Sequence, residues 1–410
     1  MEGTEKPRVL YIGLIPPTRG GRVICGAAIH GWELARKAFE NGYDVYFIAD
    51  VLGKQSQVEE EGIKIIKMPH NRLKKAISGI VALLFLNHKS RLLHEFRLRE
   101  KIAILARYFF LKKVIKAIKP QLIHVHGENT WSLSLRILAS SIPIIISNHG
   151  HLKKVEKRDD IARMKKIIGS ADFLIFVSKH LKNEEIRIIN DYKGKIFFIN
   201  NPIDPEKIPF MDKTSARKEL NLIGAKKIIL FSGICNSLKL KRLDLLLKAI
   251  NGNEKLKKTT ITIVISDEEG IKFANEYAKQ NHMDCRILGS QTWDMIIKMY
   301  NSADVFVLPS QSEAFPLVFL ESLLAGVPVV GYSNAVEEIE KLLKTYIGEK
   351  YDANTESIDT LGYKINEAIR RKIDRRKTRD KVINQLSWQR RFCEYDKVYK
   401  RAIFRAGNSD

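Results

Sequence analysis

Two glutamates, Glu313 and Glu321, lie eight positions apart in a stretch, 305–332, whose residue types can bind a charged ligand. The stretch predicts a buried strand, a polar loop that holds Glu313, a helix that begins at Pro316 and ends before Gly326, and a second buried strand. Open parallel sheets bind ligands at the carboxyl ends of their strands, and Glu313 falls at such an end. Glu313 is therefore a candidate for direct contact with a ligand.

The start of the predicted helix is a second candidate for ligand contact. Leu317 and Val318 would present free backbone amides beside Glu313, and a helix start of this kind binds phosphate. Glu321 is the only charged residue between Glu313 and Glu337, so its carboxylate needs hydrogen-bond donors among apolar neighbours. The two hydroxyls of a ribose would supply them. Alternatively, Glu321 lies on the solvated face of a surface helix and Glu313 is an ordinary loop acid.

These residues resemble the signature of glycosyltransferase family 4, the retaining transferases of GT-B fold. That signature is a strand, P-S, E-x-F-x-x-V-x-x-E, a short helix and G-x-P-V-V. The positions that match it are Ser310, Glu313, Phe315, Val318, Glu321, Gly326, Pro328, Val329 and Val330. The resemblance implies that Glu313 contacts the hydroxyls of the transferred sugar and that Glu321 contacts the ribose of the nucleotide. Phe315, Leu317 and Val318 are then expected in the donor-binding site.

The length of the chain, 410 residues, predicts two domains that are each large enough to form a core. The N-terminus enters a strand and does not resemble a signal peptide. The longest apolar run, 77–86, is about half as long as a membrane span. The four cysteines are scattered without metal-ligand spacing. We therefore expect a cytoplasmic protein.

Positive charge is concentrated in one region of the chain. The net charge is +23, and the region 70–120 contains thirteen Lys or Arg residues and two Glu residues. From 73 to 118 the pattern is helical, with apolar clusters between the cations. We expect 70–120 to bind an anionic membrane surface, which would make the protein peripheral at the inner membrane face. Alternatively, the apolar residues pack on the sheet and the lysines are only solvated.

The N-terminal half begins with a strand near 9–13, a loop rich in glycine, and a helix from about Gly26 to Asn41. The loop lacks G-x-G-x-x-G, so we predict no nicotinamide site. In the family this loop faces the acceptor, and the resemblance implies that Gly26 and His30 lie on the acceptor side. Alternatively, His30 is an ordinary histidine on a helix surface.

His149 directly follows a strand predicted near 143–147, at its carboxyl end. The resemblance implies that this histidine reaches the donor sugar and the reacting centre, where it would orient the sugar or help with the acceptor proton. Alternatively, it is a loop histidine with structural hydrogen bonds. His124, His126 and His151 are weaker candidates. No carboxylate or cysteine completes a metal-binding pattern with these histidines, and the family generally lacks a catalytic metal, so we expect neither a metal nor another cofactor.

The C-terminal half begins with a strand near 228–232 that ends at Gly233. In the family an arginine follows this glycine, and a lysine stands three positions before a helix aspartate; both hold the diphosphate of the donor. Lys241 and Asp244 match the lysine and the aspartate, but Ile234 replaces the arginine in a loop about two residues longer. Lys239 or Arg242 can supply the missing charge, and the sequence does not choose between them. Alternatively, this basic loop is only solvated.

The domain boundary is expected near Asp204, where Asn200 to Asp204 resembles the linker turn of the family. We therefore predict an acceptor-side domain over 1–204 and a nucleotide-sugar-binding domain over 205–388. A C-terminal helix over 389–410 is expected to cross back to the first domain. The predicted fold class is α/β, with two doubly wound Rossmann-like domains of GT-B type facing each other across a cleft.

The resemblance implies a retaining hexosyltransferase that moves a sugar from a UDP- or GDP-linked donor to a glycan or lipid-linked acceptor. Synthesis of a cell-surface polysaccharide, a glycolipid or a glycoprotein glycan is the expected setting. Its predicted catalytic residues are His149, Glu313 and Lys241, and Gly233 and Lys239 join the donor-binding group. One alternative is a nucleotide-sugar epimerase of the same fold. Another is a basic protein that binds nucleic acid, but no nucleic-acid motif is present and the paired glutamates would have no role.

Overall fold

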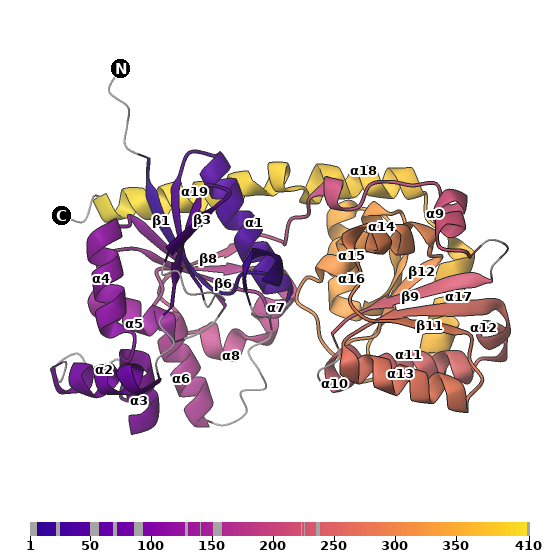
Figure 1. Cartoon of the computed structure of the whole chain (residues 1–410), viewed down its shortest axis with the longest axis horizontal. Helices are drawn as coiled ribbons and strands as arrows, with labels where there is room; N and C mark the ends of the chain where they lie inside the picture. Colours follow the sequence, from indigo (N-terminus) through magenta and orange to yellow (C-terminus); the bar gives the residue numbers. More distant parts are fainter. Residues whose placement is uncertain are drawn as a thin grey trace, which may run out of the picture. The chain divides into compact units, whose positions relative to one another are not determined.

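The computed structural model describes residues 6–21, 25–49, 57–68, 72–85, 93–127, 130–139, 141–150, 158–222, 224, 226–234 and 238–407. The chain forms two compact units (Figure 1), one comprising Met1–Asn200 with Arg391–Asp410 and the other comprising Asn201–Arg390. Within the part of the chain that the structure describes, no helix is both long and apolar enough to cross a bilayer.

The first unit contains a sheet whose described strands follow the order β3-β4-β2-β1-β5-β6-β7-β8. All neighbouring pairs are parallel except β3 and β4, which form an antiparallel edge. The strands are β1 (Arg8–Ile12), β2 (Asp44–Ala49), β3 (Gln57–Glu60), β4 (Ile63–Lys67), β5 (Leu122–His126), β6 (Ile144–Asn148), β7 (Phe173–Phe176) and β8 (Lys195–Phe198). The parallel strands agree with the predicted α/β class, whereas β3 was not predicted.

Helices surround the sheet of the first unit (Figure 1). Every residue of β5 and β6 is buried, as expected for parallel strands covered on both faces. The helices are α1 (Gly26–Glu40), α2 (Arg72–Phe85), α3 (Leu98–Leu105), α4 (Tyr108–Ile118), α5 (Trp131–Leu138), α6 (Arg158–Gly169), α7 (Lys179–Glu184), α8 (Ile186–Ile189) and α19 (Trp388–Gly407). From Arg391 onward, α19 belongs to this unit.

The predicted helical region 73–118 is not continuous, because it forms the three helices α2, α3 and α4. Separate helices can pack on one another: a Cβ atom at Gly79 in α2 would lie only 2.3 Å from the Ile102 carbonyl oxygen in α3. The apolar side chains here join a buried cluster of Ala82, Leu93, Phe96, Ile104, Leu105, Leu133, Ile137 and Ile167. Much of the apolar surface of this basic region is therefore covered by the protein itself.

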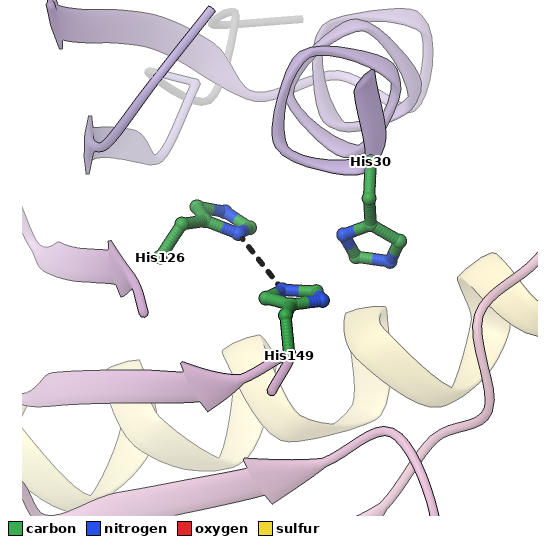
Figure 2. A group of neighbouring side chains, drawn as sticks. All are labelled: His30, His126 and His149. Carbon is green, nitrogen blue, oxygen red and sulfur yellow. Dashed lines mark hydrogen bonds between the residues drawn. The ribbon is translucent and has the colours of Figure 1, made fainter. Parts of the chain in front are cut away.

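The strand order of the first unit reverses at β1, which lies between β2 and β5. Ligands bind at such a reversal, outside the carboxyl ends of the strands. Figure 2 shows two histidines at this edge: His126 is the last residue of β5, and His149 follows directly after β6. The parallel pairing of β5 with β6 places His126 opposite Ser147, so both histidines lie at the same end of the sheet.

The second unit contains a parallel sheet in the order β11-β10-β9-β12-β13-β14 among its described residues. Its strands are β9 (Lys227–Ser232), β10 (Thr260–Ile265), β11 (Cys285–Leu288), β12 (Val305–Leu308), β13 (Val329–Tyr332) and β14 (Gly348–Tyr351). Its helices are α9 (Lys213–Glu219), α10 (Leu238–Lys241), α11 (Leu243–Asn251), α12 (Glu254–Thr259), α13 (Glu268–Gln280), α14 (Trp293–Ser302), α15 (Leu317–Leu324), α16 (Ser333–Leu343), α17 (Ile358–Arg371) and α18 (Arg375–Leu386). The strand order reverses between β9 and β12.

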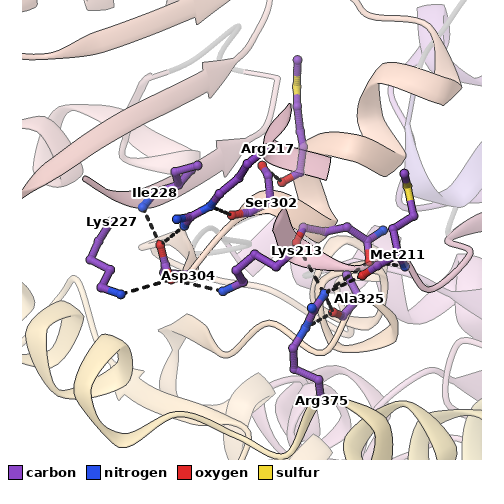
Figure 3. A network of polar contacts seen from close by, with 11 residues as sticks. Met211, Lys213, Arg217, Lys227, Ile228, Ser302, Asp304, Ala325 and Arg375 are labelled. Carbon is purple, nitrogen blue, oxygen red and sulfur yellow. Dashed lines mark hydrogen bonds and ion pairs between the residues drawn. The ribbon is translucent and has the colours of Figure 1, made fainter. Parts of the chain in front are cut away.

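Asp304, the residue before β12, joins this strand to β9 and to α9 (Figure 3). Its carboxylate accepts a hydrogen bond of 2.7 Å from the amide of Ile228 in β9, and its own amide donates to the Ile228 carbonyl over 2.8 Å. Arg217 and Lys213 of α9 both pair with the same carboxylate, which is only 10% exposed. Asp304 therefore fixes the two strands at the reversal point of the second unit.

We expect Asp304→Ala to lower the free energy of unfolding by about 3 kcal/mol, because two partly buried cations lose their counter-charge. Denaturant unfolding at neutral pH measures this loss. Burial raises the pKa of Asp304, but Lys213, the Ile228 amide and Arg217 more than offset it and hold that pKa below its ordinary value. The stabilisation is therefore complete above the pKa of an unfolded aspartate, about 3.9, and is lost as the pH falls through the folded-state pKa.

Glu254→Ala is the matched control, because Glu254 forms an exposed ion pair with Lys258 on the surface of the same unit. Exposed pairs of this kind contribute little, so no measurable change in stability is expected. The wild type and Asp304→Ala should also converge in stability as the pH is lowered. Equal losses in both variants, or a constant difference at all pH values, would contradict the role assigned to Asp304.

Candidate active site

Residues predicted to bind the donor meet beyond the carboxyl ends of β9 and β12. Lys241, at the end of α10, pairs with Glu313, in the loop between β12 and α15, with 2.6 Å between Nζ and Oε1. The two side chains are 25% and 10% exposed, so the pair is largely shielded from water. An anion that approaches Lys241 therefore meets a cation that Glu313 holds in place.

The start of α15 lies directly after the Glu313 loop. Pro316 is the residue before the helix rather than its first residue, because its backbone is extended (φ −72°, ψ 123°) and its carbonyl accepts from the Phe319 amide. No side chain among the described residues caps this helix start. Leu317 and Val318 are each partly exposed, and their amides belong to the first turn, as required for contact with a phosphate.

Phe315 is buried, with 2% of its surface exposed, and its carbonyl accepts a hydrogen bond of 2.8 Å from the Asn201 side chain. Its side chain anchors the Glu313 loop in the core. Gly233, after β9, has little room for a side chain: a Cβ atom would lie 3.3 Å from Phe231 and 3.5 Å from Leu308. Both residues therefore shape the backbone of the predicted donor site through packing.

The structure bears on which residue could supply the positive charge that is missing at Ile234. Ile234 is exposed and carries no charge. Arg242 donates two hydrogen bonds, of 3.0 and 3.1 Å, to the carboxylate of Asp244. Arg242, the residue before α11, is thus already paired with an aspartate in that helix. The side chain of Lys239 lies outside the described residues.

Glu321, in α15, has a donor that the sequence did not suggest. The hydroxyl of Tyr300, on α14, donates to Oε2 of Glu321 over 2.7 Å. Burial raises the pKa of Glu321, while the Tyr300 hydrogen bond and the charge of Lys207 act in the opposite direction. Glu321 is therefore not a fully solvated surface acid, although part of its surface stays accessible. The expectation that a ribose must supply its donors was incomplete, because Tyr300 supplies one.

Three histidines come together in the first unit (Figure 2). Nδ1 of His126 lies 3.3 Å from Nε2 of His149, and the ring centres of His30 and His149 are 4.5 Å apart. His30 is 1% exposed, so its alternative assignment as a surface histidine is wrong. His149 is partly exposed and is the member of the cluster that solvent or a ligand can reach.

The positions of these histidines depend on close packing around them. A Cβ atom at Gly13 would lie 3.0 Å from the His126 side chain, and one at Gly31 would lie 3.4 Å from it. The hydroxyl of Tyr395, on α19, lies 3.1 Å from Nε2 of His30. The C-terminal helix therefore holds a residue that the sequence assigned to the acceptor side.

His124 stacks on His126, with 4.4 Å between the ring centres, and has a structural role. Its two ring nitrogens lie 2.7 Å from the hydroxyls of Tyr399 and Ser147. Burial, with a smaller effect of His149, lowers its pKa to about 3. Burial also lowers the pKa values of His30 and His126 well below the ordinary value. These three imidazoles are therefore neutral at pH 7. His151 lies outside the described residues.

Gly26 is the first residue of α1 and is exposed. The carbonyl of Cys25, the residue before the helix, accepts hydrogen bonds from the amides of Ala28 and Ile29. Gly26 thus exposes backbone at the start of the helix that carries His30. This location agrees with contact to a ligand at the carboxyl edge of the first sheet.

Comparison with known proteins identifies relatives for both halves of the chain. Residues 24–207 match the family described as Glycosyltransferase Family 4, and residues 212–385 match Glycosyl transferases group 1. An uncharacterised glycosyltransferase of Methanocaldococcus jannaschii is 30% identical over 164 residues, which cover 38% of this chain and 41% of the relative. A D-inositol 3-phosphate glycosyltransferase of Mycobacteroides abscessus is 28% identical over 171 residues, 40% of this chain and 37% of the relative.

These two alignments span less than half the length of either relative. The fold has a more extensive counterpart in the sucrose-phosphate synthase of Thermosynechococcus elongatus, with a TM-score of 0.72. At 14% identity, that match covers 97% of this chain and 99% of the synthase. It confirms the GT-B fold class and its two Rossmann-like sheets. Since family matches extend over both units, the chain belongs to glycosyltransferase family 4.

Proposed function

We propose that this protein transfers a hexose from a UDP- or GDP-linked donor to a glycan or lipid-linked acceptor, with retention of the anomeric configuration. The observation that carries the proposal is the ion pair between Lys241 and Glu313, a residue of the loop that leads into α15. This arrangement combines a cation and backbone amides for a diphosphate with a carboxylate for sugar hydroxyls. The proposed products are intermediates of a cell-surface polysaccharide, a glycolipid or a glycoprotein glycan.

Stabilisation of the leaving diphosphate is the main chemical task of such a transferase. Charge develops on the diphosphate as the bond to the sugar breaks, and fixed donors aimed at that charge lower the barrier. Lys241 and the amides of Leu317 and Val318 are the proposed donors. When the diphosphate binds Lys241, Glu313 becomes available to accept hydrogen bonds from the sugar. The same ion pair therefore prepares both the phosphate and the sugar parts of the donor site.

Glu321 is the proposed ribose-binding residue. The Tyr300 hydroxyl occupies Oε2 of Glu321, which fixes the carboxylate and orients it. Ribose hydroxyls then donate to the accessible part of this group. Burying a carboxylate that lacks a full set of hydrogen-bond donors lowers the stability of the protein, and binding sites often carry such a cost.

His149 is proposed to orient the transferred sugar or to assist the acceptor proton. Its Nε2 interacts with Nδ1 of His126, which fixes the orientation of the ring. Because His149 is partly exposed while His126 is buried, His149 is the member of this pair that can contact a substrate. His30 and Gly26 are the proposed acceptor-side residues.

We also propose that the region 70–120 binds the anionic cytoplasmic face of a membrane. Exposed apolar side chains remain on these helices despite the buried cluster: Ile77 is 53% exposed, Ile80 47%, Leu98 63% and Phe109 42%. Lys112, Lys113, Lys116 and Lys119 are also exposed. Apolar groups beside cations suit the membrane interface, and each cation near anionic lipid contributes about 1 kcal/mol. Membrane binding would bring the protein to a lipid-linked acceptor.

A thermal-shift screen of UDP- and GDP-sugars tests the donor site. One nucleotide sugar should stabilise the wild type, by about 2.7 kcal/mol at one hundred times its dissociation constant. Glu321→Ala should lose most of this stabilisation, because the ribose loses its acceptor. Glu276→Ala, which removes an exposed glutamate from α13 in the same unit, should keep it. The donor assignment fails if no nucleotide sugar stabilises the wild type, or if Glu321→Ala responds as the control does.

Once the donor is known, its transfer can be assayed with lipid-linked acceptors and with D-inositol 3-phosphate, the compound in the name of one relative. Release of free sugar and nucleotide without any acceptor would instead favour the epimerase alternative. Tight binding of duplex nucleic acid that is unaffected by Glu313→Ala would favour the nucleic-acid alternative.

The pH dependence of stability tests the environment of Glu321. Because burial raises its folded-state pKa, the wild type loses stability as the pH rises through that pKa. Glu321→Gln cannot ionise, yet it can still accept from Tyr300. We therefore expect the variant to gain stability relative to the wild type as the pH rises from 4 to 8. Melting temperatures across this range measure the difference, and a difference that does not change with pH would show that Glu321 is solvated.

Co-sedimentation with vesicles tests the membrane proposal. The wild type should bind vesicles that contain anionic lipid, more strongly at low salt, and should not bind neutral vesicles. Ile77→Ser combined with Ile80→Ser should weaken binding several-fold, since the apolar anchors are lost. Tyr363→Ser, which changes an exposed aromatic side chain on α17, is the control and should bind as the wild type does. Absence of binding to anionic vesicles at low salt would exclude this membrane contact.

A further inference from the structure

The three-histidine cluster of the first unit has a geometry that sugar transfer does not require. His30, His126 and His149 each present a ring nitrogen, and these three atoms lie within 4.8 Å of one another (Figure 2). They come from separate elements: α1, the end of β5 and the residue after β6. We propose that His30, His126 and His149 form a binding site for a transition-metal dication of the Zn²⁺ type.

The distances agree with three ligands of one ion. With zinc–nitrogen bonds of about 2.0–2.1 Å, two nitrogens of a tetrahedral site lie roughly 3.3 Å apart. Nδ1 of His126 and Nε2 of His149 are already 3.3 Å apart. In the structure these two nitrogens share a hydrogen bond. Metal binding therefore requires the shared proton to move to the other nitrogen of the donor ring. The third ligand must approach by at most about 1.5 Å, the difference between 4.8 and 3.3 Å.

The surroundings select the ligand atom of His30. The Tyr395 hydroxyl lies 3.1 Å from Nε2 of His30, so Nδ1 is the ring nitrogen by which His30 would coordinate the ion. A ligating histidine commonly uses its second nitrogen to bind an outer partner that fixes the ring. Figure 2 shows Nδ1 of His30 on the side of the ring that faces the other two histidines. Tyr395 is therefore the proposed outer partner of the metal site.

The chemistry of the cluster defines the class of ion. All three ligands are imidazoles, and the neutral imidazole is the form that binds a metal. Nitrogen ligands favour Zn²⁺, Co²⁺, Ni²⁺ and Cu²⁺, whereas Mg²⁺ and Ca²⁺ require oxygen ligands. A site with three protein ligands keeps a fourth position for water or a ligand oxygen. Because His149 is partly exposed, an ion can reach the cluster from its side.

The proposal has a consequence for the activity proposed above, and this consequence alone rests on that activity. A metal bound to Nε2 of His149 occupies the lone pair that could otherwise accept a proton or a sugar hydroxyl. Occupancy of the site would then inhibit transfer reversibly, and removal of the metal by a chelator would restore it. Metal binding itself is measured without any substrate, so a failed donor screen and a failed metal titration are distinguishable.

Titration of Co²⁺ into the full-length protein, purified without a histidine tag and treated with chelator, tests the site. We expect saturable binding of one ion with the visible absorption of four-coordinate cobalt, and displacement by Zn²⁺ but not by Mg²⁺. His149→Ala should weaken binding at least about tenfold, and it changes a partly exposed residue outside the strands. Tyr395→Phe should weaken binding about tenfold through loss of the outer partner.

His94→Ala is the matched control, because His94 is an exposed histidine of the same unit outside the cluster. It should bind Co²⁺ as the wild type does. Circular dichroism and the melting temperature identify any variant that fails to fold; if Tyr395→Phe unfolds, His149→Ala alone decides. The proposal is overturned if the wild type shows no four-coordinate cobalt spectrum. It is also overturned if folded His149→Ala binds Co²⁺ with the affinity of His94→Ala.

Discussion

An aspartate placed just before a buried strand fixes the strand pairs from which the candidate site residues project. Asp304 binds the backbone of Ile228, so β12 and β9 keep their register, and the loops after these strands carry Glu313 and lead to Lys241. The first unit contains a similar contact. The carboxylate of Asp172, the residue before β7, accepts a hydrogen bond from the amide of Ile144 in β6. Since β6 leads directly to His149, both candidate sites depend on the same kind of contact.

The sequence predicted most strands of both sheets because parallel strands buried on both faces are continuous apolar runs bounded by polar residues. It also placed Glu313 in the loop after a strand and Glu321 in the helix that follows, as the structure does, whereas Lys241 was expected in a loop and lies at the end of α10. It did not predict that Lys241 and Glu313 form an ion pair, because they are 72 positions apart and their distance depends on how β9 and β12 pair. The hydrogen bond from the Tyr300 hydroxyl to Glu321 was not predicted for the same reason, since it depends on the packing of α14 against α15.

The histidine cluster shows a sharper limit of local sequence patterns. Metal-ligand spacing rules identify ligands that lie a few positions apart on one element, whereas His30, His126 and His149 come from three elements. The sequence alone left His30 open between a ligand-contacting residue and a surface histidine. Predicting the cluster requires the order of the strands in the sheet: β5 lies between β6 and β1, and β1 is followed by the helix that carries His30.

The final helix explains why the first unit contains residues from both ends of the chain. Tyr395 and Tyr399 of α19 are buried, and their hydroxyls contact His30 and His124. A buried hydroxyl and a buried ring nitrogen each need a partner, so each tyrosine hydroxyl satisfies one ring nitrogen of its histidine. The orientation of His30 is therefore set by a residue 365 positions away, and the candidate site of the first unit is complete only when α19 has packed.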